Sequence, residues 1–351
     1  YAVMVNSGSS ALFIAFEVLN IKKGSEVITP VLTFGTTVSA IVKNGLVPKF
    51  VDVTKDTYCM DIKEVEKNIT NKTKAICAVN LLGNLPNLKK LRNLANKHKL
   101  ILIEDSADTL GAKLNNKYSG YYTDVSITSF YGSHIINGAG NGGMVCFNDK
   151  KFYEKALLLR SWGRSSSLFR ENSEKIENRF NIKIDGIPYD KKFVFEEMGY
   201  NLEPSEISAV FANVQFKKLN SNIKKRQLNF KKHINFFKKY TNIFNLPIEM
   251  KGANTCWLAF PIIINDSANF NRKDLQIFLE KNNIQTRVVF TGNILRQPGF
   301  KFLASKKKRD SFNNADQVMK SGMLIGCHHG LEKKHIAYMH LKISEFVNKH
   351  I

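Results

Sequence analysis

The sequence predicts an α/β fold: a mostly parallel central sheet covered by helices on both faces, followed by a smaller α+β unit. Two observations carry this prediction. Short apolar runs alternate with amphipathic segments through the first 150 residues, which implies right-handed crossovers between parallel strands. The chain of 351 residues is also long enough for two domains. We place a large domain at 1–240 and a small one at 241–351.

The predicted elements follow in order along the chain. Strands are expected at 2–5, 26–30, 48–53, 74–80 and 100–105, with helices between them at 9–19, 35–44, 61–69 and 87–99. A long periodic stretch at 205–240 predicts connecting helices. The smaller unit is expected to contain strands near 256–264 and 284–290 and helices near 272–281 and 332–347. Because no low-complexity linker separates the two units, we expect them to pack tightly.

Charge and composition narrow the class of protein. The net charge of +22 raises the possibility of nucleic-acid binding, but the lysines alternate with core-facing Leu, Ile and Phe at helical spacing. We therefore expect solvated helix faces and no nucleic-acid partner. No apolar run reaches the roughly 18 residues of a membrane span. The five cysteines are widely spaced, which argues against disulfides and a cysteine-bound metal and favours a cytoplasmic protein.

Two motifs place polar groups at the carboxyl ends of predicted strands, where ligands of such sheets bind. Gly8, Ser9 and Ser10 stand between a strand and a helix, and free amides at a helix start suit a phosphate. An ordinary serine N-cap explains the same residues equally well. Glu104, Asp105 and Asp108 follow an apolar strand, so one of them could hold a protonated ring nitrogen or simply cap a turn.

The motifs together resemble a known family. The order "NSGSSAL", "TPVLTFGTTVSAI", "EDSADTLGA", "SFYGSH" and "GYNLEPSEISAVFANVQ" is similar to that of the nucleotide-sugar aminotransferases and dehydratases with the aspartate aminotransferase (type I) fold. The resemblance implies pyridoxal 5′-phosphate (PLP) as cofactor and a homodimer with shared active sites. Members usually carry several dozen residues before the "SG" turn, so an N-terminal arm is expected to be missing from this chain.

One residue departs from the common pattern and points to a branch of the family. Members normally read S-F-x-x-x-K, and that lysine binds the cofactor covalently; here His134 occupies its place, and no lysine occurs between Lys117 and Lys150. The chain thus resembles the dehydratase branch, above all the 3-dehydratases of GDP-linked 4-keto-6-deoxymannose. Imidazole cannot hold an aldehyde but moves protons near neutral pH.

The resemblance implies a reaction for this chain. The cofactor would work untethered in its pyridoxamine form, with L-glutamate as amino donor. His134 would remove a proton so that the C3 hydroxyl of a nucleotide-linked 4-keto-6-deoxy sugar departs. Ammonia and a 3-deoxy sugar would be released. The residues themselves do not distinguish a guanosine from a cytidine nucleotide, although the resemblance favours GDP.

Further site residues are carried over by position. Asp105 would pair with the pyridinium nitrogen, Asp108 would lie near the phenolic oxygen, and Phe34 would stack on the ring. The phosphate would be bound by Ser9, Ser10 and Ser129, and by Asn201 of a neighbouring subunit. Candidates for the diphosphate or the sugar are Arg160, Arg164, Arg287, Arg296, His328 and His329. Nothing suggests a metal site.

Three alternatives stay open at this point. An iron-sulfur relative acting on CDP-linked sugars also has this histidine, but it needs closely spaced cysteines, and the carboxyl half offers only Cys256 and Cys327. A cofactor-binding protein without chemistry is a second alternative. An aminotransferase that uses a distant lysine is the third.

Overall fold

A computed structural model describes residues 1–169 and 176–350. Its centre is a seven-stranded sheet with the order β1-β9-β8-β5-β4-β2-β3. The strands are β1 (Ala2–Val5), β2 (Glu26–Pro30), β3 (Val47–Val51), β4 (Thr73–Val79), β5 (Ile101–Asp105), β8 (Val125–Ser129) and β9 (Gly143–Phe147). β9 alone among these seven runs antiparallel to its neighbours, so the predicted mostly parallel sheet is confirmed.

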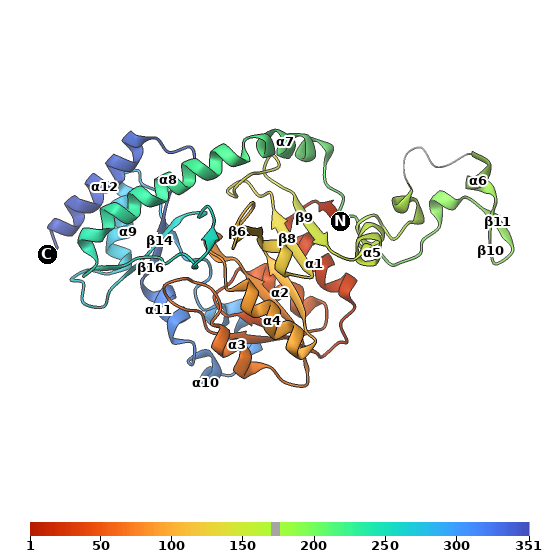
Figure 1. The fold of residues 1–351 in the computed structure, drawn as a ribbon, viewed down its shortest axis with the longest axis horizontal. Coiled ribbons are helices and arrows are strands. Elements are labelled where there is room, and N and C mark those ends of the chain that lie inside the picture. The colour runs from red at the N-terminus through yellow and green to blue at the C-terminus, as the bar shows by residue number, and fades with distance from the viewer. Residues whose placement is uncertain (170–175, 351) are drawn as a thin grey trace.

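Helices cover both faces of this sheet, as the alternating pattern requires (Figure 1). α1 (Gly8–Leu19), α2 (Gly35–Lys43) and α5 (Lys150–Arg160) pack on one face, whereas α3 (Ile62–Asn68) and α4 (Leu88–His98) pack on the other. Neighbouring residues in one strand serve opposite faces: Val27 packs with α1 and Ile28 packs with α4. This alternation explains why the strands read as continuous apolar runs.

Two consecutive helices connect the central sheet with a second, smaller sheet. α7 (Glu206–Lys217) and α8 (Leu219–Phe237) lie where the periodic stretch predicted them. α8 leads to an antiparallel sheet with the order β12-β14-β16-β15, formed by β12 (Phe244–Asn245), β14 (Phe260–Ile264), β15 (Arg287–Val288) and β16 (Gly322–Ile325). α9 (Arg272–Lys281), α10 (Lys306–Arg309), α11 (Asn313–Ser321) and α12 (Lys333–Asn348) complete this part. The proposed division at residue 240 falls between α8 and β12.

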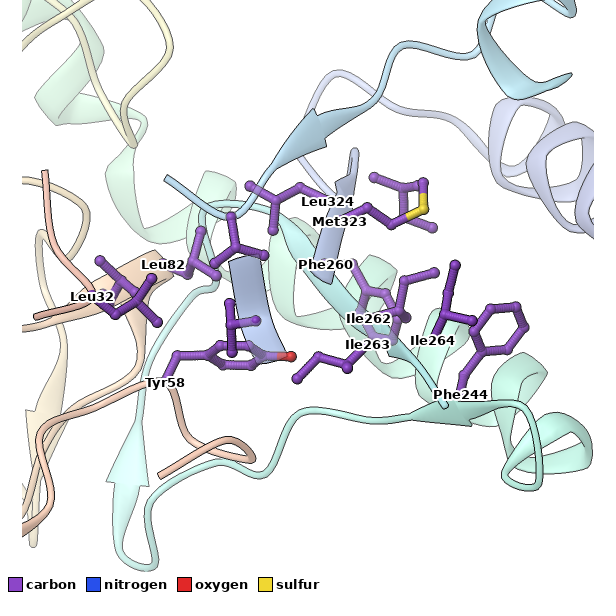
Figure 2. Close-up of a cluster of buried hydrophobic side chains, with 14 of the residues drawn as sticks. Leu32, Tyr58, Leu82, Phe244, Phe260, Ile262, Ile263, Ile264, Met323 and Leu324 are labelled. Atoms are coloured by element: carbon purple, nitrogen blue, oxygen red, sulfur yellow. The ribbon is translucent and has the colours of Figure 1, made fainter. Parts of the chain in front are cut away.

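One hydrophobic cluster joins the two sheets. Leu32 and Tyr58, from the loops that follow β2 and β3, contribute to the same cluster as Phe260 of β14 and Met323 of β16 (Figure 2). All four side chains are at most 1% exposed. Because this cluster is continuous, the two parts pack tightly against each other, as the absence of a linker suggested.

Smaller elements flank this core. A three-stranded sheet has the order β13-β6-β7, from β6 (Lys113–Leu114), β7 (Lys117–Tyr118) and β13 (Ala253–Asn254). α6 (Ile176–Phe180) and the hairpin of β10 (Ile182–Ile184) and β11 (Ile187–Tyr189) project away from the rest of the chain (Figure 1). Among the described residues, none of the helices combines the length and hydrophobicity that a transmembrane span requires.

Candidate active site

The site begins where β8 ends beside the amino end of α1. Ser129 is the last residue of β8, and Gly8 is the first residue of α1. A Cβ atom on Gly8 would lie 2.6 Å from Cβ of Ser129, so only glycine lets the helix start approach this strand so closely. The contact brings the free amides of the first turn of α1 beside the Ser129 hydroxyl.

The serines of the first turn divide their tasks. Ser7 is the N-cap, and its Oγ accepts a hydrogen bond from the backbone N–H of Ser10 at 3.1 Å. The Ser10 hydroxyl donates to Oδ1 of Asn6 at 2.6 Å. Ser9 is exposed on the same turn. The capping interpretation therefore applies to Ser7, while Ser9 lies open to a ligand at the positive end of the helix.

Asp105, the last residue of β5, is a buried carboxylate with neutral donors. Its Oδ2 accepts from Oγ1 of Thr37 at 2.8 Å and its Oδ1 from the backbone N–H of Ala107 at 3.2 Å. In the described part of the chain, no Lys, Arg or His lies within ion-pair distance of it. Burial raises its pKa. A buried carboxylate of this kind suits a cationic ligand atom. Phe34 is the N-cap of the helix that carries Thr37, is 55% exposed, and contacts the ring of Phe290 edge to face.

His134 lies in the glycine-rich loop between β8 and β9. Ile135 and Ile136, which are 1% and 3% exposed, anchor the loop against Leu219 of α8. The imidazole Nδ1 lies 3.3 Å from the carbonyl oxygen of Ser129, and the side chain is only 16% exposed. Burial is the largest cause that lowers the pKa of His134, so the imidazole is neutral at physiological pH.

Asp108 faces His134 across the site. Its Oδ1 lies 3.7 Å from Nε2 of His134, and its Oδ2 accepts from the backbone N–H of Leu82 at 2.9 Å. Burial raises the pKa of Asp108 to about 7. The distance of 3.7 Å is longer than a hydrogen bond, and burial favours the neutral form of both groups, so this contact is not a fixed ion pair.

The structure thus brings together Gly8, Ser129, Asp105, Asp108 and His134, which the sequence had assigned to one site. The chemistry of these donors fits PLP. The helix start and Ser129 offer donors to a phosphate, and the buried Asp105 carboxylate has no charged partner among the described residues, which suits a cationic ring nitrogen. Within the described residues, no three His, Cys, Asp or Glu side chains are placed to hold a metal ion. Cys256 and Cys327 are buried thiols whose pKa burial raises to about 11 and about 12.

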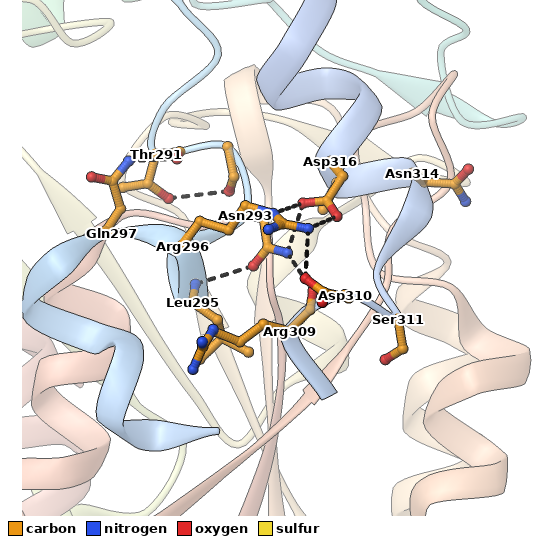
Figure 3. A network of polar contacts seen from close by, with 12 residues as sticks. Thr291, Asn293, Leu295, Arg296, Gln297, Arg309, Asp310, Ser311, Asn314 and Asp316 are labelled. Atoms are coloured by element: carbon orange, nitrogen blue, oxygen red, sulfur yellow. Dashed lines mark hydrogen bonds and ion pairs between the residues drawn. The ribbon is translucent and has the colours of Figure 1, made fainter. Parts of the chain in front are cut away.

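The predicted arginines are not gathered at this site within one chain. Arg296 is held by Asp316 and Asp310 in a network beside α11 (Figure 3), and these acids raise its pKa. Arg160 pairs with Glu203, with 3.2 Å between Nε and Oε2. The guanidinium of Arg164 lies over the ring of Trp162, 4.4 Å from its centroid.

The remaining predicted residues lie on loops. Arg287 is exposed and donates to the carbonyl oxygen of Thr286 at 2.9 Å. Asn201 is exposed and pairs with Ser161. His328 and His329 follow β16, and Nδ1 of His329 is a buried atom without a hydrogen-bond partner among the described residues.

Two residues that shape the site were missed in the sequence. Thr37 fixes Asp105 from a helix 68 residues away, and no local pattern marks that contact. Arg226 is 2% exposed on α8. A signal for it existed, because Arg226 falls in the core-facing register of its helix, where a cation is unusual.

Comparison with known proteins agrees with this geometry. The model of the DegT/DnrJ/EryC1/StrS aminotransferase family matches residues 1–344. The lipopolysaccharide biosynthesis protein RfbH of Salmonella typhimurium is 33% identical over 99% of this chain and 81% of its own length. The GDP-4-keto-6-deoxy-D-mannose 3-dehydratase of Escherichia coli is 30% identical over 93% of this chain and 84% of its own. A GDP-perosamine synthase of Escherichia coli is 34% identical over 64% of this chain and 55% of its own.

Solved structures give the same result. The Escherichia coli GDP-4-keto-6-deoxy-D-mannose-3-dehydratase with bound hydrated PLP has a TM-score of 0.87 and 29% identity, covering 97% of this chain and 87% of that one. A structure of a GDP-4-keto-6-deoxymannose-3-dehydratase with a trapped PLP-glutamate geminal diamine gives a TM-score of 0.87 and 29% identity, covering 97% of this chain and 88% of that one. The predicted fold is confirmed, the cofactor is pyridoxal phosphate, and the protein is a sugar-modifying enzyme. The chain belongs to the DegT/DnrJ/EryC1/StrS aminotransferase family.

Proposed function

We propose that this enzyme is a 3-dehydratase of a nucleotide-linked 4-keto-6-deoxy sugar, with L-glutamate as amino donor. The observation that carries the proposal is His134. A buried imidazole occupies the loop position beside Ser129 and Asp108, in a segment that has no lysine from Tyr118 to Asp149. An imidazole transfers protons near neutral pH, but it does not hold an aldehyde covalently. The relative named as a 3-dehydratase supports the same reaction.

The buried residues have distinct tasks toward the cofactor. When bound, pyridoxal phosphate in its pyridoxamine form supplies an electron sink next to the reacting sugar carbons. Asp105, steadied by Thr37, would pair with the ring nitrogen, and Phe34 would stack on the ring face. Asp108 would lie near the phenolic oxygen. Ser129 and the first turn of α1, with Gly8, Ser9 and Ser10, would hold the phosphate.

The surroundings of His134 select the nitrogen that handles the proton. Nδ1 is directed at the carbonyl oxygen of Ser129, which can only accept a hydrogen bond, so Nδ1 carries the hydrogen. Nε2 is then the unprotonated nitrogen and faces Asp108. His134 would therefore accept a proton at Nε2, and Asp108 would exchange protons with the same atom.

A second copy of this chain would complete the site. α7 exposes five large apolar side chains along its length: Ile207, Val210, Phe211, Val214 and Phe216. The projecting segment ends at Met198, which is 93% exposed. Apolar surface of this extent is typical of an interface. Asn201 is exposed and lies between Met198 and α7 in the sequence, and in the dimer it would reach the phosphate site of the partner.

The substrate would be bound by residues around this interface. We keep Arg160, Arg164, Arg287, His328 and His329 as candidates for the diphosphate or the sugar, together with Arg296, which would have to leave Asp316. The named relatives favour a GDP-linked substrate. The similarity to RfbH favours deoxysugar synthesis for a surface polysaccharide.

The experiment is product analysis by mass spectrometry. The enzyme, PLP and L-glutamate are incubated with GDP-, CDP- and dTDP-linked 4-keto-6-deoxy sugars. We expect one of them to yield a 3-deoxy sugar together with ammonia. Retention of the C3 hydroxyl on all of these sugars, by an enzyme that binds PLP, would contradict the proposal.

A nucleotide-sugar aminotransferase is the second candidate. The similarity to GDP-perosamine synthase, at 34% identity over 223 residues, favours it. Transfer of the amino group would give a 4-amino sugar without release of ammonia. The same mass spectra distinguish this product from a 3-deoxy sugar.

A further inference from the structure

The inward face of α8 is polar, which is unusual for a helix packed in a protein core. Its buried residues between Leu219 and Phe237 are Asn222, Arg226, Asn229 and His233. They are spaced by three or four residues, so they form one stripe along the helix. Buried polar groups require hydrogen-bond partners. The partners of these side chains identify the segments that α8 holds in place.

The stripe fixes two loops from the smaller part of the protein. Nη1 of Arg226 donates to the carbonyl oxygen of Trp257 at 3.3 Å and to that of Leu258 at 3.0 Å. Nδ2 of Asn229 donates to the carbonyl oxygen of His328 at 3.0 Å. His233 bonds through Nε2 to the carbonyl oxygen of Gly326 at 3.0 Å. α8 therefore positions the 257–258 segment and the 326–331 loop, which carries His328 and His329.

Arg226 is a buried cation without a counter-ion. It is 2% exposed, and no carboxylate lies within 4.0 Å of it in residues 1–169 and 176–350. Its Nε has no hydrogen-bond partner in those same ranges. A guanidinium keeps its charge at any physiological pH, and burying an unpaired charge is costly. A neutral donor could also make the two hydrogen bonds to carbonyl oxygens. These contacts therefore do not explain why position 226 carries a permanent charge.

The segment that Arg226 holds lies beside the loop of His134, because Cys256 and Leu258 pack in one cluster with Ile135 and Ile136. Leu219 and Ile223, on the preceding turns of α8, pack in one cluster with Ile135 and Ile136, the residues that follow His134. The same helix holds the loop of His328 and His329 through Asn229 and His233, so Arg226 lies on the helix that contacts both loops. Its charge contributes to the lowered pKa of His134, His328 and His329, after burial. Asp108 is the opposing charged group, 3.7 Å from Nε2 of His134.

We propose that Arg226 is a positioning residue of this enzyme: it anchors the 257–258 segment beside the loop of His134, and its permanent charge adds to burial in keeping His134 unprotonated and able to accept a proton. The role given to His134 rests on the proposed function, whereas the effect of the charge does not. Asp108 favours the imidazolium when it ionises, and Arg226 offsets that tendency. The neutral form of His134 would then persist over a wider pH range than Asp108 alone would allow.

The test is the pKa of His134, measured by NMR on protein with ¹³Cε1-labelled histidine and free of PLP. The His134 signal is assigned from its loss in His134→Asn. Arg226→Gln removes the charge but keeps a donor for a carbonyl, and Arg226→Lys keeps the charge. Lys224→Gln removes one exposed charge from the same helix and serves as the control.

We expect Arg226→Gln to raise the pKa of His134 by roughly half a unit or more, since a nearby positive charge has been removed. Arg226→Lys and Lys224→Gln should match the unaltered protein. An unchanged pKa in Arg226→Gln, or an equal rise in Arg226→Lys, would overturn the proposal. If Arg226→Gln does not fold, Arg226→Met replaces it, because a methionine buries no unpaired donor; circular dichroism shows which variant is folded.

Because the titration needs no turnover, it separates this inference from the proposed function. A shifted pKa in an enzyme that forms no 3-deoxy sugar would leave the electrostatic role standing and remove the dehydratase. Where product is formed, the acidic limb of its pH profile should move to higher pH in Arg226→Gln only.

Discussion

Oδ1 of Asp108 lies 3.7 Å from Nε2 of His134, and burial favours the neutral form of both side chains. Burial raises the pKa of the carboxyl to about 7 and lowers that of the imidazole. A neutral carboxyl can donate a proton and a neutral imidazole can accept one, so the pair can transfer a proton once the two groups approach to hydrogen-bond distance. This pair is what the site offers in place of a lysine amine.

Replacing His134 by asparagine removes the proton acceptor and keeps a side chain of similar shape. We expect formation of the 3-deoxy sugar to fall by roughly 100-fold or more, the usual contribution of a general base. Product mass spectrometry and ammonia release measure the loss. His98→Asn on the exposed face of α4 is the matched control and should keep full activity. Undiminished deoxygenation in His134→Asn would remove His134 from the reaction.

Replacing Thr37 by valine removes the hydroxyl that donates to Asp105. A hydrogen bond to a charged group contributes about 1.5–3 kcal/mol, so PLP binding should weaken by about tenfold or more. Spectroscopic titration of the apo-enzyme with PLP measures the change. Thr36→Val, one residue earlier on the same helix, should bind PLP normally. Equal affinities in the two variants would show that Asp105 does not depend on Thr37.

Replacing Gly8 by alanine places a methyl group 2.6 Å from Cβ of Ser129. The strand and the helix start must separate, which costs roughly 1–3 kcal/mol of stability. The phosphate contacts should weaken as well. Thermal unfolding and PLP titration measure the two effects, and Gly299→Ala, which has open space around it, is the control. Unchanged PLP affinity in Gly8→Ala would argue against a phosphate cradle at this position.

Glu104 predicts a pH dependence of stability. Its side chain is fully buried, accepts from Ser106, and has its pKa raised by burial. A carboxyl whose pKa is raised in the folded state stabilises the fold below its unfolded pKa, near 4.3, and loses that contribution as pH rises through the folded pKa. Glu104→Gln should therefore be at least as stable as the unaltered protein at pH 8. Urea unfolding at pH 5 and pH 8 measures this; a large loss at pH 8 would contradict it.

The exposed apolar side chains of α7 predict that two copies of the chain form a dimer. Val210→Asp and Ile207→Asp place charges on side chains that are 63% and 76% exposed in one chain. If a second copy covers this face, the buried charges should convert dimers into monomers. Sedimentation velocity measures the change. Leu228→Asp, on a side chain of α8 that is 54% exposed, should leave the assembly intact, and a monomeric unaltered protein would refute the shared site.

Local pattern was sufficient for the elements that follow one another in the large sheet. The apolar runs of β2, β4 and β5 alternate between the two helical layers, so their number and direction follow from the sequence alone. The hairpin of β8 and β9 was not predicted. Its antiparallel pairing inserts β9 between β1 and β8, and a non-local pairing of that kind leaves no periodic signal.

At the site, too, contacts between residues far apart in the sequence could not be predicted from local patterns. His134, Asp105 and Asp108 were predicted from their motifs and from the family resemblance, and the structure places them close together. The partners of the arginines were not predicted. Arg296, for example, pairs with Asp316, which lies 20 residues later and across a turn. Arg226 lies in a stretch that was interpreted as a solvated basic helix, although its position in the core-facing register was a signal that it faces inward.

Borohydride reduction of the PLP-loaded enzyme, followed by peptide mapping, tests the central claim most directly. His134→Lys provides the positive control, since it restores an amine at this position. We expect no pyridoxyl group on any lysine of the unaltered protein, and a labelled Lys in the control variant. A pyridoxyl-lysine in the unaltered protein would contradict an untethered cofactor served by the imidazole of His134.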